Sequence, residues 1–411
     1  MREKNSNLNN TKNLMKKAEQ YAGQMTSFLQ DLVRIPSVNG RDSERAVAER
    51  IIMEGKRLGL NGILIAKDND HPNAVMTYGK GKNGFALIGH IDTVTEGKPE
   101  DWTSPPFEGA IRDGRMYGRG TADNKAGIAC GVYTLQIMRD MGMIDPENHK
   151  VILAGVVDEE SGACSPLGVR YLLDEGYLSA RAAIYAYASD IVCIGHRGLL
   201  RLEITTRGES VHAGLAPWHN RCKGENAVTG LAEILIKLER LKVHTSPLPG
   251  FEHLGFTITP GTIISGGDYA SIVPNKAKAI VDIRLLPGQG KKVVMEKVIE
   301  ITEKVKQERP ALEIEMLTKA EIPGAAIPID HPLAVIAQDY TEAIHGQRWE
   351  VMGAGPGNEG YMLIGAGIPT LCGFGPIGGN PHAPDEWVDI QSLTRTAVIY
   401  AGIISEYLNR S

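Results

Sequence analysis

The sequence predicts an α/β protein in which a mixed, largely parallel sheet forms the larger domain and a ferredoxin-like domain is inserted into it. Residues 151–157 are an apolar, valine-rich run, typical of a strand buried on both faces of a parallel sheet. Between residues 200 and 316 the predicted elements follow the order βαββαβ, which is a ferredoxin-like motif. The length of 411 residues also exceeds what one hydrophobic core usually supports, so two domains are expected.

Composition excludes several classes of protein. Hydrophobic residues make up 42% of the chain and charged residues 23%, as in ordinary globular enzymes. The net charge of −5 gives no electrostatic reason to expect nucleic acid or a membrane surface as a partner. The five cysteines include no CxxC pair, which predicts free thiols in a reducing compartment. No stretch reads as a signal peptide or a membrane span, so we expect a cytoplasmic protein.

The first ninety residues should form two helices and three strands after a frayed, polar tail over residues 1–17. Met25, Phe28 and Leu32 recur at helical spacing, and Pro36 ends that helix. The other elements predicted here are a helix over residues 43–58 and strands over 63–66, 74–78 and 85–88.

The strand over residues 85–88 runs directly into Gly89-His90-Ile91-Asp92. Residues two apart in an extended backbone point the same way, so His90 and Asp92 can face one site. A carboxylate often holds the second ring nitrogen of a metal-ligating histidine. By itself the pair is weak evidence, because a strand-end histidine satisfied by a neighbouring acid is roughly twice as common.

A glycine-punctuated loop, residues 117–127, comes next and leads into a helix with Ile128, Val132 and Leu135 on one side. Asp123 lies at the junction and, taken alone, is most simply a helix N-cap. The glycines match neither GxGxxG nor the Walker pattern, which excludes a nucleotide-binding loop of those kinds.

The strand over residues 151–157 is followed at once by Asp158, Glu159 and Glu160. In an open α/β sheet, ligands bind beyond the carboxyl ends of the strands, so these acids lie where a functional cluster is expected. An isolated acidic turn would be a solvated surface feature by roughly three to one. The motifs elsewhere in the chain reverse that balance.

Four motifs occur in order: Gly-His-Ile-Asp-Thr at 89–93, Gly-Arg-Gly-Thr-Ala-Asp-Asn-Lys-Ala-Gly at 118–127, Asp-Glu-Glu at 158–160 and Asn-Pro-His-Ala-Pro-Asp-Glu at 380–386. Together they resemble the co-catalytic zinc hydrolases that include acetylornithine deacetylase, succinyl-diaminopimelate desuccinylase, aminoacylase and glutamate carboxypeptidase. The match covers about residues 34–388. It implies a metal-dependent hydrolase that cleaves an amide-type C–N bond in a small, carboxylate-bearing molecule such as an N-acyl amino acid or a dipeptide.

The resemblance also implies two divalent metal ions per subunit. Histidine and carboxylate ligands suit zinc best, and cobalt or manganese are alternatives. His90 and His382 would each bind one ion, and Asp123 would bridge the two. Glu160 would complete the His382 side.

Two further roles follow from the resemblance: Glu159 would be the general base that activates water, and Asp92 would orient His90. One acidic ligand of the His90 side is missing from its usual place, where a gapless overlay puts Ala186. Asp190 is the only acid nearby and is nominated as the displaced ligand. If Asp190 points elsewhere, the His90 side has only two strong protein ligands.

Residues 198–317 resemble the family's lid and dimerisation domain, inserted between two catalytic segments, 1–197 and 318–411. Within it, His212 matches a histidine that reaches the active site of the partner subunit, which implies a homodimer. On sequence alone, an ordinary surface histidine is the better interpretation. The elements predicted here are strands over 200–205, 255–264, 278–285 and 312–316 and helices over 226–243 and 294–305.

Substrate-binding positions are also carried over from the resemblance. Arg284 falls where the family keeps an arginine for the substrate carboxylate, a task suited to a planar guanidinium. A solvated cation at a strand end is the plainer reading of Arg284. The other positions are Asn226 and, in the glycine-rich loop 353–360 that precedes a predicted strand over 368–374, Gly357 and Asn358.

Departures from the family pattern keep a second hypothesis open. The family's asparagine before Val-Val-Pro is Ser271 here, and Gly357 and Glu359 stand where a threonine and an aspartate are usual. A metal-poor family member that acts as a binding or scaffold protein would also fit these changes. Retention of both histidines together with Glu159 weighs against it, because a decayed site should lose its base and its ligands together.

Overall fold

The computed structural model describes residues 2–410 and contains two compact units. The discontinuous unit consists of the chain up to His196 and from Ala326 onward, and the inserted unit is Arg197–Ala325. The insertion ends later than residue 317 because its last strand, β12 (Glu313–Ile322), is longer than the apolar pattern indicates.

The main sheet of the discontinuous unit has six strands in the order β1-β2-β6-β3-β7-β15. The neighbouring pairs β6/β3, β3/β7 and β7/β15 are parallel, whereas β1 and β2 pair antiparallel. This confirms the mixed, largely parallel sheet. The bounds are β1 (Asn61–Ile65), β2 (Asn73–Gly79), β3 (Asn83–His90), β6 (His149–Val156), β7 (Ala182–Tyr185) and β15 (Thr370–Cys372).

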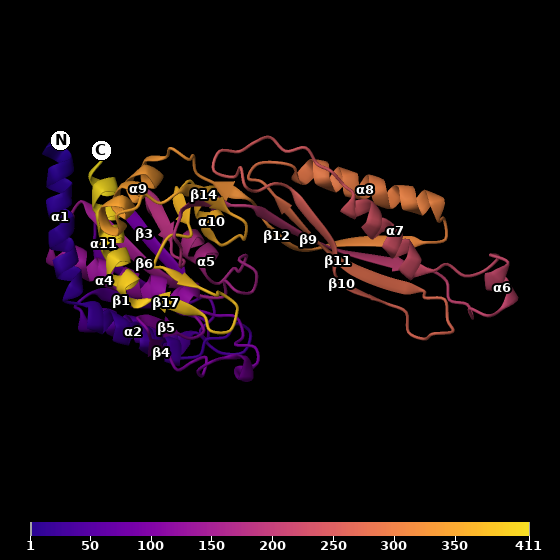
Figure 1. The fold of residues 1–411 in the computed structure, drawn as a ribbon, viewed down its shortest axis with the longest axis horizontal. Coiled ribbons are helices and arrows are strands. Elements are labelled where there is room, and N and C mark those ends of the chain that lie inside the picture. The colour runs from indigo at the N-terminus through magenta and orange to yellow at the C-terminus, as the bar shows by residue number, and fades with distance from the viewer. Residues whose placement is uncertain (1, 411) are drawn as a thin grey trace. The chain divides into compact units, whose positions relative to one another are not determined.

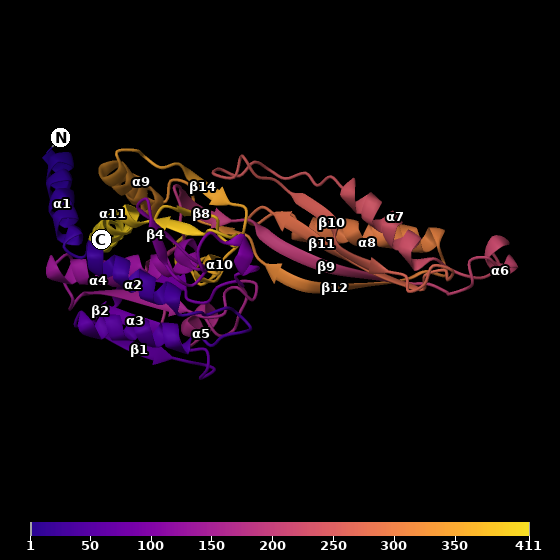
Figure 2. The ribbon, with the colours of Figure 1, turned by 60° about the horizontal axis from the view of Figure 1, so that its bottom comes forward.

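Helices cover both faces of this sheet because its strands are apolar on both sides. Ile88 and Ile152 belong to a core shared with Val169 and Leu363 of the small helices α5 (Val169–Asp174) and α10 (Gly360–Gly365). Leu153 points the other way, against α4. Figure 2 shows α3 lying over β1 and β2, which it contacts. The remaining helices are α2 (Ala22–Arg34), α3 (Arg45–Arg57), α4 (Ala126–Asp140), α9 (Pro332–His345) and α11 (Ile390–Asn409).

The N-terminal segment corrects one expectation. Instead of a frayed tail, residues Arg2–Glu19 form helix α1, which runs beside α11 (Figure 1). Leu14 and Ala18 are one turn apart and buried. This apolar stripe is too narrow to stand out in an Asn/Lys-rich sequence, so packing rather than periodicity determines the helix.

The sequence did not predict two small sheets. In the sheet formed by β4, β5, β16 and β17, the hairpin β16–β17 pairs with β5, which places the loop 380–386 beside the glycine loop that follows β5. The strands of this sheet are β4 (Ala110–Arg112), β5 (Arg115–Tyr117), β16 (Gly378–Gly379) and β17 (Trp387–Asp389). The other small sheet comprises β8 (Val192–His196), β13 (Ala325–Ala326) and β14 (Val351–Ala354). Short helical turns lie at η1 (Pro99–Asp101) and η2 (Thr121–Lys125).

The inserted unit is a four-stranded antiparallel sheet in the order β10-β11-β9-β12, with two helices on one face (Figure 1). Ile204 and Val281 of the sheet pack with Leu231 and Val298 of the helices. This strand order with βαββαβ connectivity confirms the ferredoxin-like prediction. The elements are β9 (Gly198–Arg207), α6 (Ala216–His219), α7 (Ala227–Glu239), β10 (Thr257–Gly266), β11 (Lys276–Leu285), α8 (Lys291–Glu308) and β12.

Two predictions from composition are addressed by the fold. All five cysteines are free, as their number and spacing indicated. No helix among residues 2–410 is long and apolar enough to span a membrane.

Candidate metal centre

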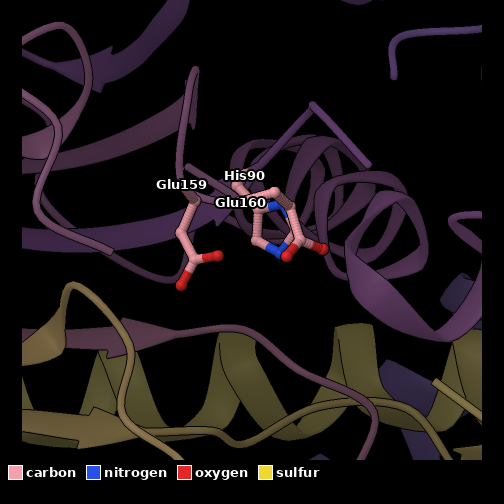
Figure 3. Close-up of side chains that lie close together, drawn as sticks. All are labelled: His90, Glu159 and Glu160. Carbon is pink, nitrogen blue, oxygen red and sulfur yellow. The ribbon is translucent and has the colours of Figure 1, made fainter. Parts of the chain in front are cut away.

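Two neighbouring parallel strands end side by side and carry the first candidate residues. The register of β3 with β6 pairs His90 with Val156, so His90 and the acids after Val157 leave the sheet at the same edge. His90 is fully buried, and Glu159 is 6% exposed. Figure 3 shows one carboxylate oxygen of Glu159 pointing toward the imidazole of His90 and the carboxylate of Glu160.

Asp123 lies between the two histidines. Its Oδ1 is 2.7 Å from Nε2 of His90, and its Oδ2 is 3.2 Å from Nε2 of His382. Oε1 of Glu160 lies 3.1 Å from the same nitrogen of His382. In the part of the chain that the structure describes, the groups of three or more potential ligands within 4.8 Å of one another are His90–Glu159–Glu160 and Asp123–Glu160–His382.

This donor set fits a pair of divalent metal ions. Imidazole nitrogens and carboxylate oxygens are ligands that zinc accepts, and Asp123 presents one oxygen to each histidine, as a bridging ligand must. Nδ1 of His90 lies 3.0 Å from the carbonyl oxygen of Asp92, which can only accept a hydrogen bond. Nδ1 of His90 can therefore donate to this carbonyl, and Nε2 is the ring nitrogen that faces Asp123 and would be the ligating atom.

Asp92 ties the ends of the two strands together. Its Oδ2 accepts hydrogen bonds from the backbone N–H of Glu160 at 3.0 Å and from the side-chain amide of Asn39 at 3.1 Å. Asn39 also donates to Asp158 at 2.7 Å. The sequence gives no signal for Asn39, because a single asparagine far from every motif is indistinguishable from a loop residue.

The electrostatics of the cluster follow from burial and crowding. Burial raises the pKa of Glu159 to about 8; His90 opposes this shift, and Glu160, Asp123 and Asp92 add to it. Hydrogen bonds to Asp123 and Glu160 raise the pKa of His382 to about 10. Burial opposes ionisation of Asp123, but the two histidines hold the pKa of its carboxyl well below the usual range. Crowded acids of this kind favour a bound cation.

Glu386, which the sequence did not single out, fixes the loop that carries Asp123. Its buried carboxylate accepts hydrogen bonds from the backbone N–H groups of Ala122 at 2.8 Å and Asp123 at 2.9 Å. The guanidinium of Arg119 is its ion-pair partner. Because Glu386 and His382 share one loop, a single loop supplies a potential metal ligand and the support for Asp123, the acid that contacts both histidines. The sequence signal that could have identified Glu386 is its place as an acid shortly after His382.

Comparison with known proteins places the chain in a family. Residues 86–406 match the sequence model described as "Peptidase family M20/M25/M40", a span that includes every residue of the two ligand groups. The chain belongs to peptidase family M20/M25/M40.

Relatives of this M20 chain cover nearly all of it. An uncharacterized protein of Escherichia coli K12, YgeY, is 29% identical over 411 residues, covering 96% of this chain and 97% of that one. A succinyl-diaminopimelate desuccinylase of Cereibacter sphaeroides is 28% identical over 396 residues, covering 92% and 97%. A dinuclear metal-binding M20 peptidase of Bacillus subtilis has the same fold, with a TM-score of 0.70 at 14% identity, covering 96% and 100%.

Asp190, nominated as the missing M20 ligand, is not brought into either ligand group. Its side chain is exposed. The backbone N–H of Ser189 donates to the carbonyl of Pro376, and the hydroxyl of Ser189 bonds the backbone of Ile191, which fixes the turn with Asp190 facing outward. A carboxylate from this turn therefore does not complete the His90 side.

Tyr187, which the sequence did not indicate as a site residue, lies beside His90. The ring centroids of Tyr187 and His90 are 5.5 Å apart, and the Tyr187 hydroxyl donates to Oε1 of Glu159 at 3.1 Å. Burial raises the pKa of Tyr187 well above its usual value, and the nearby carboxylate of Glu159 adds to this, so the phenol is neutral. An apolar-looking Tyr-Ala-Tyr at a strand end gives no sign of this contact.

Three predicted site residues lie in the inserted unit and not in the ligand groups. His212 is exposed, and its Nδ1 accepts from the backbone N–H of Gly214 at 3.0 Å. Arg284 is half-buried and forms an ion pair with Asp282 at 2.7 Å. The side chain of Asn226 caps helix α7.

Two predicted substrate-binding residues lie in the loop between β14 and α10. Gly357 is half-buried. The amide of Asn358 is engaged by the chain itself, since it donates to the carbonyl of Cys372 at 3.0 Å and accepts from the N–H of Gly360 at 2.9 Å. The neighbouring Glu359 is buried and accepts from the Tyr185 hydroxyl at 3.1 Å.

Proposed function

We propose that this M20 chain is a dinuclear metal-dependent hydrolase that cleaves an amide-type C–N bond in a small, carboxylate-bearing molecule. One observation carries the proposal: Asp123 divides its two oxygens between His90 and His382, and the buried carboxylate of Glu159 stands beside them. A solvated acidic turn would leave these groups apart.

Each residue of the cluster has a part in the proposed reaction. Bound there, divalent ions, most simply zinc, would polarise the substrate carbonyl and make water more acidic. Glu159 accepts the proton of the attacking water at its carboxylate and returns it to the leaving nitrogen. Asp92 keeps His90 oriented and fixes the backbone of Glu160.

The relatives support the reaction class. The Cereibacter sphaeroides relative is a desuccinylase, and the Bacillus subtilis relative is a dinuclear metal-binding peptidase. Both names concern amide bonds, which is why we propose an N-acyl amino acid or a peptide as the substrate. The free cysteines are in keeping with the reducing cytoplasm.

Association of the chain into a homodimer, with His212 lent to the partner's site, is part of the proposal. Strand β10 is an edge strand, and the inserted unit exposes Ile263, Ile264 and Tyr269. Edge strands with exposed apolar side chains are prone to pair with another chain. Mixing inactive Glu159→Ala and His212→Ala chains should restore activity, because one site of each heterodimer lacks both defects. No recovery despite subunit exchange would contradict a His212 acting in trans.

A hydrolysis screen tests the function itself. Purified protein with added Zn²⁺, Mn²⁺ or Co²⁺ is assayed against N-acyl amino acids, dipeptides and N-carbamoyl amides, with release of the free amine as the readout. We expect turnover of at least one class. The second candidate, a metal-poor binding protein, is favoured by the outward-facing Asp190 and would retain far less than one metal ion per chain.

A further inference from the structure

Tyr187 occupies a fixed place beside the candidate metal centre. The register of β3 with β7 pairs Ile88 with Tyr185, so two residues further on Tyr187 lies alongside His90. The rings of Tyr185 and Tyr187 are stacked, with centroids 5.6 Å apart and an interplanar angle of 20°. The ring of Tyr187 is therefore packed against both the ring of Tyr185 and the imidazole of His90, which restricts the positions open to its hydroxyl.

The carboxylate of Glu159 depends on that hydroxyl. Among residues 2–410, Tyr187 is the one side chain or backbone group that donates a hydrogen bond to it. The backbone of Glu159 is held separately, because its carbonyl accepts from the N–H groups of Gly162 at 3.1 Å and Ala163 at 2.6 Å. The turn thus fixes the backbone of Glu159, and the hydroxyl of Tyr187 fixes its carboxylate.

The neighbours of Glu159 explain why a fixed donor is needed. A carboxylate oxygen of Glu159 and one of Glu160 lie within 4.8 Å of each other, and when both acids are ionised their like charges would push a free glutamate side chain away from the centre. A lysine or arginine donor would hold Glu159 but would add a positive charge beside a cation site. A phenol donates a hydrogen bond and adds no charge.

We propose that Tyr187 is a positioning residue whose hydroxyl holds Glu159 in the orientation from which it takes a proton from water. This rests on the proposed function of Glu159. On the His90 side of the cluster, where the family pattern predicts a further acidic ligand, Tyr187 therefore supports the proposed base Glu159.

The test compares two variants that each lose one hydroxyl from the stacked pair. Tyr187→Phe removes the bond to Glu159, and Tyr185→Phe, the matched control, removes the bond to Glu359 and keeps both rings. We expect kcat of Tyr187→Phe to fall by about 10- to 100-fold, the range for a hydrogen bond to a charged group, with KM and metal content unchanged. Tyr185→Phe should retain wild-type kcat.

A double-mutant cycle separates positioning from a general structural effect. In a Glu159→Gln background, Tyr187→Phe should cause no further loss of residual activity, because it acts through Glu159. A full additional loss in that background, an unchanged kcat in Tyr187→Phe, or an equal loss in Tyr185→Phe would each overturn the proposal.

Crystal structures of the wild type and Tyr187→Phe supply a readout that does not depend on turnover. We expect the Glu159 carboxylate to occupy one rotamer in the wild type and to leave it in the variant. The same rotamer in both would overturn the positioning role even if the enzyme is active. If the wild type hydrolyses no substrate but Glu159 moves in the variant, the proposed function fails and the contact between Tyr187 and Glu159 stands.

Discussion

The two units differ in what they bury. The interior of the discontinuous unit contains ionisable side chains, among them His90, Asp123, Glu159, Lys125 and Glu386. In the inserted unit, the buried polar side chains of the described residues are the threonines Thr205, Thr206 and Thr302. Both units have extensive apolar cores, so the difference lies in where charge is kept away from water.

This difference shows that the discontinuous unit is the one that bears the free-energy cost of buried charges. Burying a charge is costly unless it is paired, and the acids of the discontinuous unit are only partly paired. The inserted unit instead has the interior of a simple two-layer fold, held by apolar packing. We therefore expect metal dependence and the pH dependence of metal binding to belong to the discontinuous unit.

The largest expected effect separates base from ligand within that unit. Glu159→Gln should lower kcat by about 10²- to 10⁴-fold, the range for general acid–base catalysis, and should retain metal. His382→Ala should lose both activity and metal, because it removes a proposed ligand. Elemental analysis and steady-state rates are the measurements. Asp190→Ala, an exposed acid, is the control and should match the wild type; equal metal loss in both site variants would contradict the assignment.

A packing change should affect the inserted unit alone. Leu231 is buried in the core of that unit, and Leu231→Ala should destabilise it by about 2–5 kcal/mol through the lost contacts and the cavity. Denaturation followed by circular dichroism and by metal content would measure this. Ile236→Ala on the same helix, 48% exposed, is the matched control and should cost less than about 0.5 kcal/mol. Loss of bound metal in Leu231→Ala would contradict the prediction that this change affects the inserted unit alone.

Metal removal should affect the other unit. A ligand at about 100 times its Kd stabilises the folded state by about 2.7 kcal/mol, so chelation should lower the melting temperature of the discontinuous unit. The melting temperature of the inserted unit should not change; its transition is identified as the one that Leu231→Ala shifts. Differential scanning calorimetry with and without chelator would show it. A shift of both transitions by the same amount would indicate that the units unfold together.

The smallest expected effect is a pH dependence away from the metal centre. Burial alone would raise the pKa of Glu54, but hydrogen bonds from Arg57, Tyr133 and Arg50 lower it below its usual value. A lowered folded-state pKa adds stability above the unfolded value of about 4.3, and that stability is lost as pH falls through the folded pKa. Glu54→Gln should flatten this acid limb in urea denaturation of metal-free protein. An identical acid limb in variant and wild type would contradict the role.

The sequence predicted those features that depend on local patterns. The strand β6 and the acids after it are visible as an apolar run followed by charge, and the order of elements in the inserted unit follows from their periodicity. Tyr187 and Asn39 could not be predicted, because their partners come from other strands and loops. Asp190 was nominated as the nearest acid in the chain, but the hydrogen bonds of its turn, not its position, determine where it faces.

The loop that carries His382 and Glu386 has a consequence for the order of events during synthesis. Asp123 and Glu386 are 263 residues apart in the chain, and the whole inserted unit is made between them. The contacts of the inserted unit lie largely within its own segment, so we expect it to fold before residues 380–386 are made. Until residues 382–386 emerge, Asp123 has neither the imidazole of His382 nor the backbone support of Glu386. We therefore expect the proposed metal centre to assemble late in maturation, and a chain truncated before residue 380 would lack His382 and Glu386.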